Sequence, residues 1–199
     1  MEFKIENTEV YGIEKSIKAS GNPMRTIFDR DDVNEKDFKR AFKLGQTVNG
    51  QGHDNFLKGI IVQMDLTAPL YFWKQAQRYH WFDFVSSQST MHCLLKFDVK
   101  NQCVKDTDER VIDIVKSLID EYLKLNNDDP NKVVLWRKIV ASLPCGFCLG
   151  ATMTTNYQQL KTMYFQRKNH KLSEWHRFCD WCETLPYFKE LTGISENGK

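Results

Sequence analysis

Residues 68–92 combine aromatic rings with hydrogen-bond donors, a combination that suggests a binding site. The segment, APLYFWKQAQRYHWFDFVSSQSTMH, holds nine aromatic or imidazole rings beside Gln75, Arg78 and a run of hydroxyl side chains. Rings offer stacking surfaces, and an arginine offers a planar fork of donors that stays protonated. The mixture predicts a site for a flat, charged ligand. The plainer alternative is a half-buried helix and strand with ordinary polar edges.

Three serines in this segment, Ser86, Ser87 and Ser89, could supply hydroxyl groups to a phosphate. A run of serines is also typical of a polar loop. The Gly-x-Ser-x-Gly motif of serine hydrolases is absent, and no adjacent histidine and acid would activate a serine. We therefore do not expect a hydrolase.

Four of the six cysteines form two Cys-x-x-Cys pairs, Cys145/Cys148 and Cys179/Cys182. Together they could supply the four soft ligands of a zinc ion, although the 30 residues between the pairs (149–178) exceed the spacing of common zinc ribbons. The first pair could instead be a redox dithiol at the start of a helix, where a thiol pKa is lowered. The third possibility is four buried thiols without a chemical role.

Composition favours one folded domain, residues 1–199, with a polar tail from about residue 193. The 28 basic and 26 acidic residues leave a formal charge of +2, which does not indicate a nucleic-acid-coating protein. The apolar runs are shorter than the roughly 20 residues of a membrane span, and the first ten residues are too polar for a signal peptide. We expect a cytoplasmic protein of a microbe or a phage, without a membrane or nucleic-acid partner.

The spacing of apolar residues predicts strands mixed with helices, and we expect an α/β fold, a small mixed sheet with long helices packed on it. β-branched and alternating residues predict strands at 3–11, 60–66 and 94–99. Helical spacing predicts helices at 31–44, 71–79, 108–125, 133–143, 150–166 and 172–182. The second of these helices would place Gln75 and Arg78 on one face. Residues 45–55 form a glycine-rich loop that carries His53.

Several motifs, in order along the chain, resemble those of the flavin-dependent thymidylate synthases. In the first half these are His53, Ala68-Pro69, Lys74-Gln75 and Arg78, which resemble the family's upstream histidine, its Ala-Pro and Arg-Gln pairs and the first arginine of its signature. In the second half, Leu143-Pro144 resembles the family's Leu-Pro. Asn156, Arg167 and Arg177 follow at the family's spacings of twelve, eleven and ten residues.

The resemblance implies an enzyme that transfers a one-carbon unit to C5 of a pyrimidine nucleotide, dUMP. It implies FAD as cofactor, methylenetetrahydrofolate and NADPH as co-substrates, and a homotetramer whose sites are shared between subunits. Matching positions make Arg177 an expected catalytic residue and Gln75, Arg78 and Arg177 expected substrate contacts. Ser89, which matches the signature's second Ser only after a shift of one residue, is the other expected catalytic residue, and Ser87 is expected to donate its hydroxyl to the phosphate. The expected flavin contacts are His53, Arg78, His80 and Asn156, and Arg167 would support the last two helices.

The sequence departs from the family's pattern at several cationic positions. Tyr79 and His80 follow Arg78 where the signature continues His-Arg, and the signature's later Ser, Asn, Ser and Arg fall on Asp83, Val85, Gln88 and Thr90. Val140 and Gln158 stand where arginines are expected, and Lys58-Gly59 replaces an upstream Glu-His.

Three alternatives stay open because of these departures. One is a hydroxymethylating relative of the enzyme, and one is a nucleotide-binding protein that has lost the flavin. The third is a zinc-stabilised interaction module. A cysteine thiolate that attacks C6 of the pyrimidine would be a different route to the same C5 chemistry.

Overall fold

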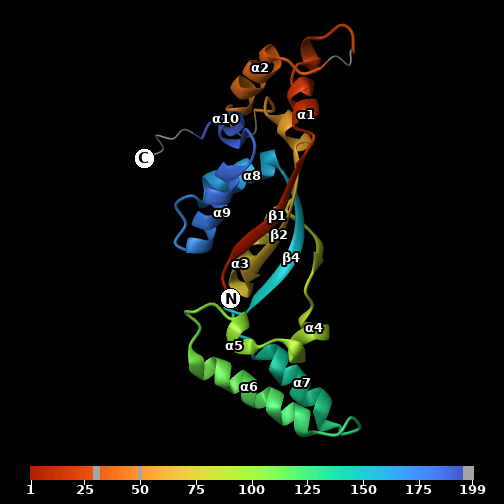
Figure 1. The fold of residues 1–199 in the computed structure, drawn as a ribbon, viewed down its shortest axis with the longest axis vertical. Helices are drawn as coiled ribbons and strands as arrows, with labels where there is room; N and C mark the ends of the chain where they lie inside the picture. Colours follow the sequence, from red (N-terminus) through yellow and green to blue (C-terminus); the bar gives the residue numbers. More distant parts are fainter. Residues whose placement is uncertain (29–31, 49–50, 195–199) are drawn as a thin grey trace. The chain divides into compact units, whose positions relative to one another are not determined.

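The computed structural model describes residues 1–28, 32–48 and 51–194. Its sheet contains β1 (Lys4–Tyr11), β2 (Ile61–Pro69), β3 (Asp83–Ser87) and β4 (Cys148–Asn156), hydrogen-bonded in the order β1-β2-β4-β3. The strands are antiparallel, and helices are inserted between them along the chain (Figure 1). The predicted α/β fold is confirmed, and the small sheet is antiparallel where a mixed sheet was expected.

The chain forms two compact units from interleaved segments. Unit 1 comprises Met1–Lys4, Leu66–Arg78 and Val85–Thr152, and unit 2 comprises Ile5–Asp65, Tyr79–Phe84 and Met153–Lys199. All four strands contribute residues to both units. Among the described residues, no helix has both the length and the apolar character needed to cross a membrane.

Unit 1 contains one long helical hairpin and several short helices. The helices are α3 (Leu70–Ala76), α4 (Thr90–Cys93), α5 (Val99–Gln102), α6 (Glu109–Lys124) and α7 (Asn131–Ala141), with the 3-10 turn η3 (Leu94–Lys96). Helices α6 and α7 lie side by side (Figure 1). Their apolar faces close a core around Val115, Ile139 and Phe147, which are fully buried. The helices predicted at 108–125 and 133–143 are confirmed as α6 and α7.

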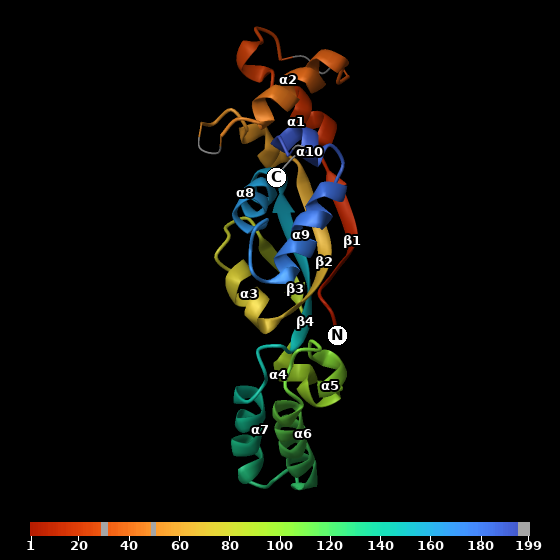
Figure 2. The ribbon, with the colours of Figure 1, turned by 90° about the vertical axis from the view of Figure 1, so that its left-hand side faces the viewer.

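Unit 2 contains α1 (Ile13–Ala19), α2 (Glu35–Gly45), α8 (Tyr157–Arg167), α9 (Ser173–Thr184) and α10 (Phe188–Thr192), with the 3-10 turns η1 (Asn22–Met24) and η2 (Asn55–Gly59). Helices α8 and α9 lie side by side (Figure 2). Aromatic rings fill the core: Trp175 contacts Phe178 with ring centres 5.5 Å apart, and Tyr157 contacts Phe188 at 5.1 Å. The helices predicted at 31–44 and 172–182 are confirmed as α2 and α9, although residue 31 lies outside the described residues.

The strand predicted at 94–99 is wrong, because this segment forms η3 and the start of α5. The Asp98 side chain caps α5 by accepting hydrogen bonds from the backbone N–H groups of Lys100 and Asn101, at 3.1 and 3.3 Å. Local capping of this kind competes with strand pairing. The apolar residues of this segment therefore lie in helical turns, from which they pack into the core of unit 1.

The helix predicted at 150–166 is wrong in its first half, where β4 replaces it. Alternate residues of this strand, Ala151, Met153 and Thr155, are buried, which is the two-residue period of a strand. The β-branched threonines in CLGATMTTN favour this conformation. Asn156 ends the strand and caps α8, so the helical spacing is valid only from residue 157 onward.

Four more elements, α3, β3, α1 and α10, differ from the sequence prediction or are missing from it. The helix expected at 71–79 ends at Ala76, and residues 77–81 form a turn. Strand β3 and the short helices α1 and α10 escaped prediction because each is brief and lacks a full period of apolar residues.

Candidate functional site

Helix α3 carries Gln75 and positions Arg78, two of the expected nucleotide contacts. Buried Phe72 and Trp73 hold the helix within unit 1, and the Trp73 indole N–H donates to the carbonyl oxygen of Leu149 at 3.2 Å. Gln75 is half-buried in the last turn. Arg78 is exposed beyond the helix end, and its backbone N–H donates to the Gln75 carbonyl at 3.4 Å. The two residues therefore share a turn, not the continuous helix face that the sequence predicts.

The expected serines lie on β3 and just after it. All five residues of this edge strand, Ser87 included, are exposed. Ser89 is half-buried at the N-cap position of α4, and its hydroxyl makes no capping hydrogen bond. Between them, the Gln88 backbone N–H donates to the Gly150 carbonyl, and the Gly150 N–H donates to the Gln88 side-chain oxygen, both at 2.8 Å. Gln88 thus fixes the serines beside β4, a role that no sequence motif indicates.

The turn after α3 divides its aromatic residues between core and surface. Within unit 2, Tyr79 packs against Trp175 with ring centres 6.2 Å apart, and Phe82 packs against Phe178 at 5.9 Å. His80 and Trp81 are exposed, and Trp81 has a φ of 63°, which is uncommon for a bulky residue. Of the neighbouring rings Tyr79, His80 and Trp81, each of which could stack on a ligand, Tyr79 is therefore committed to packing.

Arg167 connects α8 to α9 through aromatic contacts. Its Nε donates to the Tyr79 hydroxyl at 2.6 Å, and its guanidinium carbon lies 4.5 Å from the centre of the Trp175 ring. The Tyr79 hydroxyl in turn donates to the side-chain oxygen of Gln166 at 3.0 Å. This geometry agrees with the structural role that the resemblance implies for Arg167.

His53 is exposed, whereas the next residue is one of the most buried charged groups of unit 2. Asp54 is 1% exposed and Lys161 of α8 is 3% exposed. The Lys161 ammonium lies 2.9 Å from the Asp54 carboxylate and also donates to the carbonyl oxygens of Gly45 at 2.8 Å and Thr47 at 2.6 Å. This network anchors the segment around His53 to α8.

The sequence reasoning missed Asp54 and Lys161, although a signal for the lysine exists. Lys161 lies four residues after Tyr157 and three before Tyr164, and both tyrosines are buried. A lysine at this spacing occupies the buried face of a helix and requires partners there.

The start of α8 holds the remaining expected flavin contact, Asn156, and the unexpected Gln158. Asn156 is buried, and its side-chain oxygen accepts a hydrogen bond from the Gln159 backbone N–H at 2.9 Å. The Gln158 amide donates to Asp54 at 3.0 Å and to Asn55 at 3.4 Å. Gln158 therefore serves the same polar network as Lys161.

Arg177 and the second cysteine pair lie on different faces of α9. Arg177 is exposed, whereas Cys179 and Cys182 are buried among the aromatic residues. Burial, with the nearby acids Asp180 and Glu183, raises the pKa of the Cys179 thiol to about 12. Burial also raises the pKa of Cys182 well above its usual value. Both cysteines are therefore neutral thiols near pH 7, unlike the thiolates that attack carbon or bind zinc.

The first cysteine pair does not begin a helix, which corrects that expectation. Cys145 is exposed in a turn, and buried Cys148 is the first residue of β4, so the pair lies between a turn and a strand. This pair lies in unit 1 and the other in unit 2. Within residues 1–28, 32–48 and 51–194, no group of three or more His, Cys, Asp or Glu side chains is placed to hold a metal ion. The described residues give the zinc site no support.

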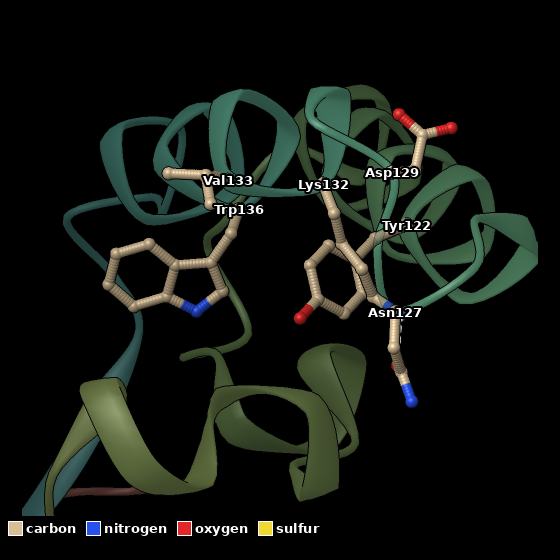
Figure 3. A pocket seen from close by; sticks show the side chains of 6 residues that line it. All are labelled: Tyr122, Asn127, Asp129, Lys132, Val133 and Trp136. Carbon is tan, nitrogen blue, oxygen red and sulfur yellow. Dashed lines mark hydrogen bonds between the residues drawn. The ribbon is translucent and has the colours of Figure 1, made fainter.

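A cavity of about 490 Å³ lies at the tip of the α6–α7 hairpin, and none of the expected site residues lines it (Figure 3). The rings of Tyr122 and Trp136 project to the same side of the hairpin. Lys132 lies 5.1 Å from the Tyr122 ring centre and donates to the Leu125 carbonyl at 3.0 Å and the Asn127 side chain at 2.8 Å. These contacts close the loop between the two helices.

Each unit therefore offers an exposed set of donors suited to anions and carbonyl oxygens. In unit 1 they are Arg78 and the hydroxyl of Ser87, and in unit 2 they are His53, His80 and Arg177. Arginine and hydroxyl donors suit phosphate, and imidazoles can donate from either ring nitrogen.

Sequence comparison finds no relatives, since no family model and no curated protein matches the chain. Structural comparison gives extensive similarity. A flavin-dependent thymidylate synthase, ThyX from Helicobacter pylori in complex with FAD and dUMP, matches with a TM-score of 0.68 and 13% identity over 96% of both chains. A second structure of that enzyme with FAD and dUMP gives a TM-score of 0.67, 14% identity and the same coverage.

A third similar structure is PolB from Streptomyces cacaoi, a UMP/dUMP methylase bound to 5-Br dUMP. Its TM-score is 0.64 and its identity 11%, over 97% of this chain and 92% of that one. At such identities the similarity establishes architecture. The chain has the fold of the flavin-dependent thymidylate synthases.

Proposed function

We propose that the protein transfers a one-carbon unit to C5 of dUMP. The observation that carries this proposal is the structural match along almost the entire chain to proteins whose structures contain dUMP or its 5-bromo derivative. The residues at the matching sequence motifs, Gln75, Arg78 and Arg177, have the chemistry that a pyrimidine nucleotide requires.

Substrate recognition is assigned to the arginines and hydroxyls. Arg78 and Arg177 are exposed, and their planar forks can donate two hydrogen bonds each to the phosphate or to a uracil carbonyl. Donation to the O4 or O2 carbonyl withdraws electrons from the ring and stabilises charge that develops as the C5 bond forms. Gln75 orients the base, and Ser87 adds a donor for the phosphate. Ser89, whose hydroxyl is not used for capping, is assigned to the reacting end of the nucleotide.

FAD is the proposed cofactor, and the hydrogen-bond donors at the expected flavin contacts have the chemistry that an anionic dinucleotide requires. His53 and His80 expose imidazoles, Arg78 exposes a guanidinium, and Asn156 marks the N-terminus of α8, where backbone N–H groups favour negative charge. When bound, the flavin carries hydride to the one-carbon unit. Methylenetetrahydrofolate as carbon donor and NADPH as reductant complete the proposed reaction.

A specific observation favours a second candidate, a nucleotide-binding protein without flavin. Gln158 stands where a cationic flavin contact is expected, and its amide is committed to Asp54 and Asn55. Each missing charge-assisted hydrogen bond weakens binding by about 1.5–3 kcal/mol. In this alternative Arg177 and Arg78 still contact dUMP, and no turnover follows.

We also propose a homotetramer, as the resemblance implies. Helices α6 and α7 expose the apolar residues Ile114, Leu123, Val133 and Val134, which a subunit contact would cover. Sedimentation equilibrium of the purified protein measures this directly, and a monomer would remove the proposal of shared sites.

The enzymatic proposal is tested with dUMP tritiated at C5. Forming a carbon bond at C5 must release the hydrogen that C5 carries, so tritium should enter water when FAD, NADPH and methylenetetrahydrofolate are all present. Mass spectrometry of small molecules released from the purified protein identifies the bound cofactor and nucleotide. Tight dUMP binding without tritium release would favour the non-catalytic alternative, and the absence of nucleotide binding would contradict both.

A further inference from the structure

The buried ion pair of Lys161 and Asp54 has no part in the roles assigned above. Burying an ammonium and a carboxylate costs free energy unless every donor and acceptor finds a partner. Here the three N–H bonds of Lys161 meet three acceptors, the Asp54 carboxylate and the carbonyl oxygens of Gly45 and Thr47. The pair is thus a fully satisfied network.

All three acceptors come from the chain segment that surrounds His53 in sequence. Gly45 is the last residue of α2 and Thr47 follows shortly after it, while Asp54 immediately follows His53. The same Asp54 carboxylate also accepts from Gln158, one turn before Lys161 on α8. Two side chains of one helix therefore hold the residue next to His53, while the imidazole of His53 stays exposed.

We propose that Lys161 and Asp54 are positioning residues that fix the backbone at His53 and so present its imidazole to the flavin in one orientation. The inference rests on the proposed function, in which His53 contacts FAD. A contact held in place before binding avoids the entropy loss of ordering it, and this increases affinity. The network acts through His53 and does not touch the ligand.

The central test is a double-mutant cycle between Lys161→Met and His53→Ala, with the Kd of FAD measured by fluorescence titration of the full chain. Lys161→Met is expected to weaken FAD binding by about tenfold, and His53→Ala in that background should add little further loss, because both changes remove one contact. The matched control is Lys168→Met, which removes an exposed lysine that follows the same helix. Additive losses, or an unchanged Kd in Lys161→Met, would overturn the proposal.

A milder variant covers the case in which Lys161→Met fails to fold, because that change leaves the Asp54 charge buried without its cation. Gln158→Leu removes one of the two side chains that donate hydrogen bonds to Asp54, and it keeps the ion pair with Lys161. It is expected to weaken FAD binding, again without a further loss on His53→Ala. If Gln158→Leu lowers the thermal midpoint of the protein but leaves the FAD Kd unchanged, the network is merely structural and the proposal fails.

Hydrogen exchange separates a failure of this inference from a failure of the proposed function. Backbone amides at residues 51–55 should exchange faster in Gln158→Leu than in the unaltered protein, with or without FAD. If the unaltered protein binds no FAD, the proposed cofactor is wrong. Hydrogen exchange then decides by itself whether the network orders the backbone at His53. Faster exchange in Gln158→Leu supports the inference that the network orders residues 51–55, and unchanged exchange overturns it.

Discussion

The guanidinium carbon of Arg167 lies 4.5 Å from the centre of the Trp175 ring, while its Nε donates to the Tyr79 hydroxyl. Arg167 is the last residue of α8 and Trp175 lies in the first turn of α9, so this stack joins the two helices at their connection. A planar cation on an indole face is stabilising by about 0.5–2 kcal/mol, more when desolvated. The contact makes Arg167 a structural residue of unit 2.

Replacing Arg167 by lysine should destabilise the protein. A lysine ammonium is compact and cannot both stack on Trp175 and reach the Tyr79 hydroxyl with a rigid fork. We expect a loss of about 1–2 kcal/mol in the free energy of unfolding, measured by urea denaturation. Arg177→Lys, at an exposed position of α9, is the control and should stay within about 0.5 kcal/mol. Equal effects of the two changes would show that the stack contributes nothing.

Arg177→Ala should weaken dUMP binding without unfolding the protein. Loss of a charge-assisted contact worth about 1.5–3 kcal/mol corresponds to a Kd raised about 10- to 150-fold, measured by isothermal titration calorimetry. Arg110→Ala is the control, because Arg110 is an exposed arginine at the start of α6 whose guanidinium pairs with Asp108 at 2.7 Å. An unchanged dUMP affinity in Arg177→Ala would remove Arg177 from the substrate site.

Much of the fold could be predicted because its longer elements carry a complete apolar period. The stripe on α6 and the alternation of β1 are local properties, so the sequence alone indicates them. Strand β4 was missed because its residues are also compatible with a helix, and only pairing with β2 and β3 decides between the two. Edge strand β3 was missed for a different reason, because all five of its residues are exposed and no buried face marks them.

The candidate site also contains some residues that the sequence indicates and others that it does not. Spacing indicates Gln75, Arg78 and Arg177 because they belong to motifs, yet it cannot show that Arg78 lies beyond the end of α3. The Asp54–Lys161 pair joins residues 107 positions apart, and only the packing of α8 brings their side chains together. Helical spacing places Lys161 on the buried face of α8, but it cannot identify Asp54 as its partner, because that contact depends on tertiary structure.

Thiol reactivity should separate exposed Cys145 from the buried pair Cys179 and Cys182. Because burial raises the pKa of Cys179 to about 12, almost none of it is thiolate at pH 8, whereas Cys145 is exposed. Iodoacetamide at pH 8 should therefore modify Cys145 first and reach Cys179 and Cys182 only after denaturation, as followed by peptide mass spectrometry. Rapid alkylation of Cys179 in the folded protein would contradict its burial.

The same pKa shift predicts a loss of stability in alkali. The folded state favours the neutral Cys179 thiol, so its pKa in the fold, about 12, exceeds the value of 9.0 taken for the unfolded chain. The associated stabilisation is fully present below pH 9.0 and is lost as the pH rises from there toward 12. Comparing the pH dependence of the thermal midpoint in Cys179→Ala and the unaltered protein isolates this contribution. Parallel curves across that range would contradict it.

Gly45→Ala should destabilise the protein because of one close approach between backbones. A β-carbon built on Gly45 would lie 2.1 Å from the carbonyl oxygen of Leu191, so α2 and α10 would have to move apart. We expect a loss of about 1–3 kcal/mol in the free energy of unfolding, measured by urea denaturation. Gly150→Ala is the matched control, because its added carbon would meet Gln88 at 3.4 Å and Thr67 at 3.5 Å, which are ordinary contacts.

The Gly45 carbonyl also accepts a hydrogen bond from Lys161, so displacement of α2 should loosen the segment around His53 as well. Gly45→Ala should therefore weaken FAD binding while Gly150→Ala does not. Equal FAD affinities of the two variants would show that the end of α2 does not influence the proposed cofactor site.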